Sequence, residues 1–169
     1  SISNLPIPKV MTYQLEASFE TVRFARPARG LLVLHGSQTL EVSCLGIVAS
    51  DTTQGHRFLS TKKVIKLTQA SDYEKIMRDD GYVIASFDER KKKILAELKR
   101  QSEVHGLLID EDDALLDEVT ALVEWPVVYA AKFEDKYLSV PEECLILTMK
   151  SNQKYFPLFN ENKKLAAKF

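Results

Sequence analysis

The sequence has little cysteine and no long hydrophobic run, and these two shortages exclude several classes of protein. Its only cysteines, Cys44 and Cys144, are a hundred positions apart, which fits no metal-ligand spacing and is typical of a reducing compartment. Aliphatic runs such as residues 31–34 are far shorter than the ~20 residues that span a bilayer. The first residues lack a basic segment followed by an apolar one, so no secretory signal is predicted. We therefore expect a cytoplasmic protein.

Glycine is also scarce, and its six positions lack the spacing of a phosphate-binding loop. No two glycines stand in a G-x-G arrangement, so the sequence predicts no nucleotide site. His35, His56 and His105 form no H-x-x-x-H pair, and we expect the chain to hold neither a metal nor a cofactor. A G-x-S-x-G nucleophile elbow is absent as well, although the members of a catalytic triad come together only in the fold. No catalytic residue is predicted.

What is present is the composition of an ordinary folded domain. Of the 169 residues, 45% are hydrophobic and 28% are charged, and the net charge is −1. At ~100–200 residues per domain, this length suits one compact unit or two small ones that share a core. We predict a single α+β domain over residues 1–169. We also expect an N-terminal portion of a longer polypeptide, because the chain opens without methionine and closes on an apolar segment.

Basic and acidic residues are unevenly distributed along the chain. Residues 1–100 hold 16 Lys and Arg against 11 Asp and Glu, a balance of +5, whereas residues 101–169 hold 7 against 13, a balance of −6. A basic first part suits a polyanionic partner, which an acidic second part would repel. Charged, solvated faces that balance each other explain the same pattern equally well.

Residues 19–68 are rich in strand-forming side chains, with Pro27, Gly30 and Gly36 as interruptions. Gly36 and the two residues after it stand between apolar runs, which predicts a hairpin. The strands and extended segments that we expect cover residues 21–26, 31–35, 39–48, 64–67, 127–133 and 155–159.

Helix signals follow between residues 71 and 150. Apolar residues at helical spacing, such as Ile94 and Leu98, supply the buried faces. The four helices that we expect begin at a capping box of Ser71 and Glu74, at Asp88, near Asp112 and at Pro141. Strands followed by helices and then by mixed elements indicate an α+β fold with a mixed, mostly antiparallel sheet and about four helices.

Three short stretches carry side chains suited to nucleic acid. Residues 23–29 interleave guanidinium and apolar groups, residues 52–58 place a glycine beside imidazole and guanidinium groups, and residues 150–156 combine amide, ammonium and aromatic groups. Guanidinium groups suit phosphate, and aromatic groups stack on unpaired bases. A salt-bridged edge strand, a structural histidine and core packing of the aromatics are the respective alternatives. The predicted nucleic-acid contacts are Arg26, Arg29, His56, Arg57 and Lys154.

Two further features have simpler explanations than a site. The basic run at residues 90–93 spans about one helical turn, so its charges radiate around the helix and are expected to form a solvated face. Glu124 stands beside Trp125, the only tryptophan, where a general base is conceivable. A helix end packed by Trp125 is the simpler interpretation.

Several strings in the sequence together resemble one protein family. They are LPIPK at residues 5–9, RP at 26–27, GHRF at 55–58, GYVIA at 81–85, LDEVTALVEWP at 116–126 and QKYFP at 153–157. In order and spacing they are similar to the beta subunit of bacterial two-subunit glycyl-tRNA synthetase. The resemblance covers essentially all 169 residues.

The resemblance implies an α2β2 ligase in which the alpha subunit binds ATP, with Mg²⁺, and glycine, while the beta subunit recognises tRNA(Gly). The chain would then be non-catalytic on its own and would support tRNA recognition and subunit assembly. It also looks like the α+β editing domain of the phenylalanyl-tRNA synthetase large subunit. Hydrolytic editing, with Glu124 or His56 as the first suspects, and a purely architectural role are the alternatives.

This sequence departs from the family at two places. Residues 11–14 read MTYQ where MRWG is common, and Asn152 stands where His or Asp often precedes QKYF. An amide is no general base near neutral pH, so a hydrolytic mechanism that used that histidine would be lost here.

Overall fold

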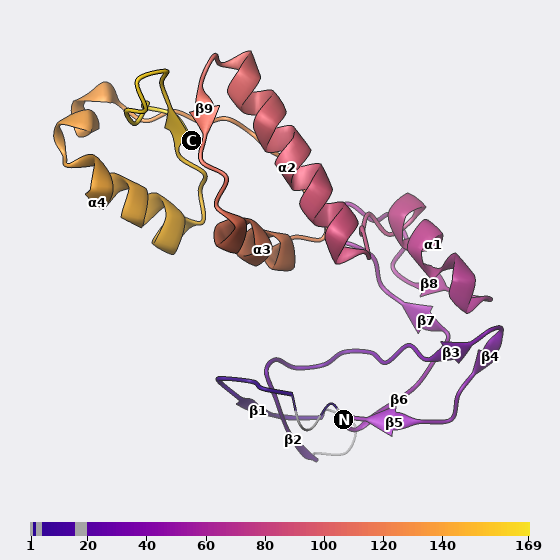
Figure 1. Cartoon of the computed structure of the whole chain (residues 1–169). Helices are drawn as coiled ribbons and strands as arrows, with labels where there is room; N and C mark the ends of the chain where they lie inside the picture. The colour runs from indigo at the N-terminus through magenta and orange to yellow at the C-terminus, as the bar shows by residue number, and fades with distance from the viewer. Residues whose placement is uncertain (1, 3–4, 16–19) are drawn as a thin grey trace. The chain divides into compact units, whose positions relative to one another are not determined.

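The computed structural model describes residue 2, residues 5–15 and residues 20–169, and it forms two compact units, Ser1–Tyr82 and Val83–Phe169 (Figure 1). Residue 19, where the strand-rich region was expected to begin, lies outside the described residues. Helices and small antiparallel two-stranded sheets occur together, which confirms the α+β prediction. The single domain over residues 1–169 stays a prediction.

The first unit begins with the antiparallel pair β1 (Met11–Gln14) and β2 (Thr21–Phe24). Strand β2 forms where alternation predicted it, with Val22 buried between the exposed Thr21 and Arg23. The strand ends at Phe24, two residues before the end of the predicted strand and three before Pro27.

Two short hairpins follow in the first unit. Strands β3 (Leu34–His35) and β4 (Gln38–Thr39) pair around a turn in which Gly36 has φ of 60°, which confirms the predicted hairpin. The prediction of a strand over residues 39–48 was wrong in its extent. Strands β5 (Ser43–Cys44) and β6 (Ile47–Val48) form a second hairpin there, because Leu45 and Gly46 both have positive φ, 54° and 75°.

The rest of the first unit is a strand pair and a helix. Strand β7 (Thr52–Thr53) pairs antiparallel with β8 (Ile65–Lys66), the strand expected near residues 64–67. Helix α1 (Tyr73–Asp79) follows a 3₁₀ turn, η2 (Ala70–Asp72). The predicted capping box was wrong, because Ser71 lies inside the 3₁₀ turn and the helix begins after Asp72 with no side-chain cap.

Helices α2 (Phe87–Val104) and α3 (Asp113–Leu122) carry the core of the second unit. Ile94 and Leu98 of α2 pack with Leu116 of α3. The cap of α2 is Ser86 rather than Asp88: its Oγ accepts the N–H of Glu89 at 3.3 Å, and Asp88 lies in the first turn.

The end of α2 and the start of α3 both form where the sequence predicted them. Gly106, with φ of 61°, follows the end of α2, and the N–H of Leu107 donates to the carbonyl of Ser102 at 2.9 Å. Asp112 caps α3 as predicted, because its Oδ1 accepts the N–H of Leu115 at 3.0 Å. Strand β9 (Leu108–Ile109) lies between the two helices in sequence and pairs antiparallel with β10 (Leu158–Phe159).

The remaining elements of the second unit are short. The 3₁₀ helix η3 (Asp135–Ser139) precedes α4 (Glu142–Leu147), and the π-helical segment η4 (Thr148–Gln153) follows. This confirms helix after Pro141, which is the N-cap of α4. The strand over residues 127–133 was wrong: among the described residues, only an isolated bridge between Lys132 and Lys168 forms there.

Candidate nucleic-acid interface

Four of the five predicted nucleic-acid contacts lie in the first unit. Arg26 and Arg29 are exposed in the segment that follows β2, where the N–H of Ala28 donates to the hydroxyl of Tyr13 at 3.2 Å and ties the segment to β1. Arg29 lines a cavity of about 460 Å³ that residues 52–54 also line. Two of the three predicted stretches therefore meet at one cavity.

His56 is held at the start of a tight loop. Its Nδ1 accepts the N–H groups of Phe58 and Leu59, each at 3.2 Å, and its carbonyl accepts the N–H of Ser60 at 3.1 Å. An imidazole nitrogen that accepts two N–H groups carries no proton, so the proton of neutral His56 is on Nε2. Half of this side chain's hydrogen-bonding capacity is therefore used to shape the loop.

The base of this loop is fixed against residues 80 and 81. The N–H of His56 donates to the carbonyl of Gly81 at 2.6 Å, and a Cβ at Gly55 would lie 2.6 Å from Gly81 Cα and from its carbonyl oxygen. Ser60 Oγ donates to the carbonyl of Asp80 at 2.9 Å, and Lys62 pairs with the Asp80 carboxylate at 2.7 Å. Only glycine permits so close an approach of two backbone segments.

Arg57 and Phe58 lie at the exposed side of the loop. Phe58 is 83% exposed. Arg57 Cζ lies 5.6 Å from the centroid of the Phe58 ring. A guanidinium over an aromatic face at this distance is a cation–π arrangement. Phe58 is missing from the predicted contacts, although an aromatic inside an otherwise polar, glycine-containing stretch was the signal that pointed to it.

The fifth predicted contact, Lys154, belongs to the second unit and forms an ion pair there. It has φ of 61°, and its Nζ lies 2.9 Å from Oε1 of Glu118. The ring of Tyr155 stacks on Phe169, with centroids 4.4 Å apart and planes 13° apart. Phe156 packs against the α2–α3 core, as its alternative interpretation held. Within the second unit this stretch makes internal contacts.

The carboxylates of the acidic segment in the second unit form ion pairs with four lysines from other elements. Lys150 lies 2.7 Å from Asp110 Oδ2 and 3.1 Å from Asp112 Oδ2, and Lys99 lies 2.8 Å from Glu111. All six carboxylates between residues 110 and 118 are paired: Asp110, Glu111, Asp112, Asp113, Asp117 and Glu118. For this part of the chain, the interpretation of mutually balancing charge fits.

The basic run at residues 90–93 is not the solvated face that we expected. Arg90 donates to the carbonyl of Ile84 at 2.6 Å and to that of Thr120 at 3.1 Å. Lys91 lies 2.7 Å from Asp117, and this hydrogen bond raises the pKa of its ammonium group. Lys93 Nζ lies 4.4 Å from the centroid of a Trp125 ring. Three of its four residues therefore join α2 to α3 and to the segment after it, while Lys92 is exposed.

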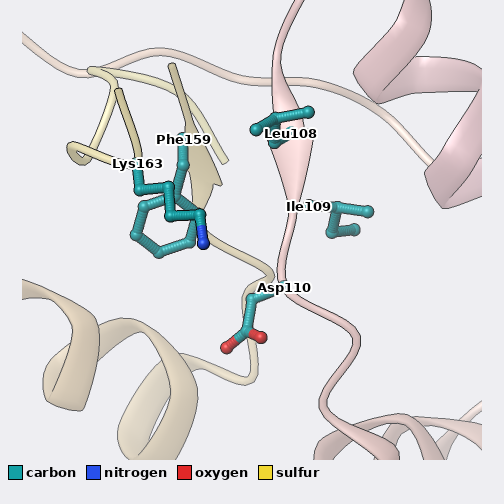
Figure 2. A pocket seen from close by; sticks show the side chains of 5 residues that line it. All are labelled: Leu108, Ile109, Asp110, Phe159 and Lys163. Atoms are coloured by element: carbon teal, nitrogen blue, oxygen red, sulfur yellow. The ribbon is translucent and has the colours of Figure 1, made fainter. Parts of the chain in front are cut away.

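A smaller cavity, of about 300 Å³, lies beside the β9–β10 pair (Figure 2). Figure 2 shows Leu108, Ile109 and Asp110 on one segment and Phe159 and Lys163 on the facing one. Its one carboxylate, Asp110, is already paired with Lys150. The cavity therefore offers an apolar wall with the Lys163 ammonium group beside it, and its described lining residues supply no second carboxylate for acid–base chemistry.

The two suspects for hydrolysis belong to different units. Glu124 is exposed after α3, in the second unit, and its carbonyl accepts the N–H of Ile84 at 3.0 Å. His56 belongs to the first unit.

Over the residues that the structure describes, no group of three His, Cys, Asp or Glu side chains is arranged to hold a metal ion. No helix in that same part of the chain is long and apolar enough to cross a membrane.

Comparison with known proteins gives a consistent result. Residues 1–169 match a family model described as glycyl-tRNA synthetase beta subunit. Similar proteins include glycine--tRNA ligase beta subunits of Methylobacillus flagellatus, at 50% identity, Leptothrix cholodnii, at 48%, and Neisseria meningitidis serogroup C, at 50%. Each alignment covers 100% of this chain and 24% of the relative.

Proposed function

The chain belongs to the glycyl-tRNA synthetase beta subunit family, as the resemblance indicated, and from this premise we propose that it is part of a glycine-tRNA ligase and contributes tRNA recognition and subunit assembly. The proposed partners are tRNA(Gly) and an alpha subunit, in an α2β2 assembly in the cytoplasm. ATP, with Mg²⁺, and glycine bind the alpha subunit in this proposal, and the present chain is non-catalytic on its own.

The distribution of unpaired positive charge supports the tRNA part of the proposal. Arg26, Arg29 and Arg57 are exposed, and none of them forms an ion pair with any residue that the structure describes. Lys62 and Lys66 of the first unit and several lysines of the second unit, among them Lys91 and Lys150, are instead paired with carboxylates. Guanidinium groups left without carboxylate partners are available to phosphate oxygens.

The salt dependence of RNA affinity tests this proposal. Each phosphate contact steepens the plot of log affinity against log salt by ~0.7–0.9. Changing Arg26, Arg29 and Arg57 together to Gln is therefore expected to weaken tRNA(Gly) binding at low salt and to flatten this slope by roughly 2 to 3 units. The matched control removes the same charge from exposed lysines of the second unit: Lys92, Lys163 and Lys164, each changed to Gln.

The two triple variants have equal net charge, so only position distinguishes them. Equal loss of affinity in both would mean that binding follows net charge alone, and the proposed contacts would be rejected. Absence of tRNA binding by the unmodified chain at low salt would reject tRNA recognition by this chain.

An architectural role is favoured by a different observation, the internal contacts of residues 150–156. Because Lys154 pairs with Glu118 and Tyr155 stacks on Phe169, this stretch supports the second unit itself. Changing Lys154 to Met is then expected to lower stability, whereas changing Arg57 to Gln lowers RNA affinity. Loss of folding in both variants would favour architecture over tRNA binding throughout the chain.

Hydrolytic editing stays a prediction without such support. Its suspects Glu124 and His56 belong to different units, and His56 Nδ1 already accepts two backbone N–H groups. Deacylation of misacylated tRNA(Gly) by this chain, above the rate in buffer, is the measurement that would revive it.

A further inference from the structure

Phe58 combines high exposure with a fixed backbone, and the combination matters more than either property. A single exposed apolar side chain is ordinary on a protein surface. Phe58, however, is 83% exposed in a loop whose N–H groups at positions 58 and 59 are both held by His56 Nδ1. The backbone that carries the exposed ring is therefore held in place.

The same loop is anchored from two more directions. Gly55 lies against the backbone of Gly81, and the single hydroxyl hydrogen of Ser60 is shared between the carbonyls of Asp80 and Lys62, at 2.9 and 3.1 Å from Oγ. A segment with this many fixed points loses little conformational entropy when a ligand binds to it. An aromatic ring on such a support is preorganised for contact.

One cation, Arg57, lies against the Phe58 ring. Arg57 Cζ lies 5.6 Å from the Phe58 centroid, and Lys63 is exposed farther along the loop. The carboxylate of Asp80, at the base of the loop, is paired with Lys62 at 2.7 Å. The surface around Phe58 thus offers a flat apolar face with positive charge next to it.

We infer that Phe58 is a stacking platform for one unpaired RNA base, with Arg57 binding a phosphate adjacent to that base. An unpaired nucleotide supplies both complements, a π-face and a phosphate, whereas the bases inside a duplex are stacked on both faces by their neighbours. This inference rests on the proposed tRNA recognition and adds to it a residue and a class of ligand. His56 is a positioning residue in this arrangement.

Binding of two RNA hairpins to the 169-residue chain tests the inference. Both hairpins close their stem with a non-nucleotide linker, so neither has unpaired loop bases; one carries a short single-stranded 3′ overhang and the other has a blunt end. Stacking is worth ~1–3 kcal/mol per base, so changing Phe58 to Leu is expected to weaken binding of the overhang hairpin roughly 5- to 150-fold and to leave the blunt hairpin almost unaffected. Changing Phe58 to Trp is expected to retain the affinity, since it preserves the aromatic face.

Salt dependence separates Phe58 from Arg57. Phe58→Leu removes no charge, so the slope of log affinity against log salt is expected to stay the same, whereas Arg57→Gln lowers it by ~0.7–0.9. Tyr129→Leu is the matched control, because Tyr129 is an aromatic residue of similar exposure, 80%, in the second unit, and no change is expected there. Thermal melts of each variant check that the fold is intact.

The outcomes distinguish failure of the stacking role from failure of the proposed tRNA recognition. If the unmodified chain binds neither hairpin at low salt, tRNA recognition by this chain and the stacking role are both rejected. If Arg57→Gln weakens binding and Phe58→Leu does not, tRNA recognition stands and the platform is rejected. Equal losses for the overhang and blunt hairpins in Phe58→Leu also overturn the platform, as does loss of affinity in Phe58→Trp.

Discussion

Lys150 and Asp112 form the contact that ties the π-helical segment η4 to the start of α3, with Nζ 3.1 Å from Oδ2. Asp112 uses its other oxygen, Oδ1, to cap α3 through the N–H of Leu115 at 3.0 Å. The hydrogen bond from Leu115, followed by that from Lys150, lowers the pKa of Asp112. Burial lowers the pKa of Lys150, but its hydrogen bonds to Asp110 and Asp112 outweigh this and leave it raised.

The lowered pKa of Asp112 predicts acid sensitivity of the second unit. A carboxyl group whose pKa is lower in the folded than in the unfolded state stabilises the fold fully above its unfolded pKa of ~3.9. That stabilisation is lost as the pH falls through the folded pKa. Changing Asp112 to Asn keeps a good N-cap but removes the ionisation, so its stability is expected to vary less between about pH 2 and pH 5.

Urea unfolding of the original chain and of Asp112→Asn across that pH range measures the difference. Near neutral pH the variant is expected to lose only the ~0.2–1 kcal/mol typical of a partly exposed ion pair. Parallel acid profiles for the two proteins would show that Asp112 has no lowered pKa.

Local signals predicted the parts of the fold that local physics determines. The Asp112 cap and the spacing of Ile94 and Leu98 are visible within a few residues, and α2 and α3 form where they indicated. The turn at Leu45 could not be predicted from local signals, because leucine is rarely found at positive φ. Its φ of 54° divides the strand-like residues 39–48 into two hairpin strands.

The candidate site shows the same division. Arg57 and His56 became candidates because a polar stretch with a glycine is a local pattern. The pairing of Lys154 with Glu118 and of Lys91 with Asp117 depends on residues far along the chain, which no local pattern contains. Whether a basic residue is free to bind phosphate was therefore beyond sequence reasoning, and only the contacts separate Arg57 from Lys154.

Arg90 is predicted to be the most important member of its basic run for stability. Its guanidinium donates to the carbonyls of Ile84 and Thr120, and replacing it with Met leaves these partly buried acceptors without that donor. The expected loss is ~1–3 kcal/mol of unfolding free energy. Arg90→Lys is expected to restore little, because a single ammonium does not reproduce the planar fork.

Urea unfolding measures this loss, with Lys92→Met as the control on the same helix. Lys92 is exposed, so its replacement is expected to change stability by less than ~0.5 kcal/mol. Equal effects at the two positions would show that Arg90 contributes only helix propensity or net charge.

Gly55 is predicted to tolerate no side chain. A Cβ there would lie 2.6 Å from backbone atoms of Gly81 and 2.8 Å from Ser60 Cβ, so Gly55→Ala forces the loop away from residues 80 and 81. We expect a destabilisation of ~1–3 kcal/mol, typical of overpacking, together with weaker RNA binding. Gly30→Ala is the matched control: nothing lies within 4 Å of its Cβ, so stability is expected to be unchanged or slightly higher. Similar melting temperatures for the two variants would contradict the close approach.

His56 is predicted to act through its acceptor atom rather than through direct contact with RNA. Nδ1 accepts the N–H groups of Phe58 and Leu59 at 3.2 Å, and the Oδ1 of an asparagine reaches a similar position from the same backbone. His56→Leu removes the acceptor and is expected to cost ~1 kcal/mol of stability and to weaken RNA binding, because the loop no longer holds Phe58 in place. His56→Asn is expected to restore both.

The asparagine variant decides between the two roles, since it keeps the acceptor and discards the imidazole ring and Nε2. If RNA affinity falls in His56→Asn as far as in His56→Leu while the melting temperature recovers, the ring itself contacts RNA. Recovery of both properties assigns His56 to the support of Arg57 and Phe58.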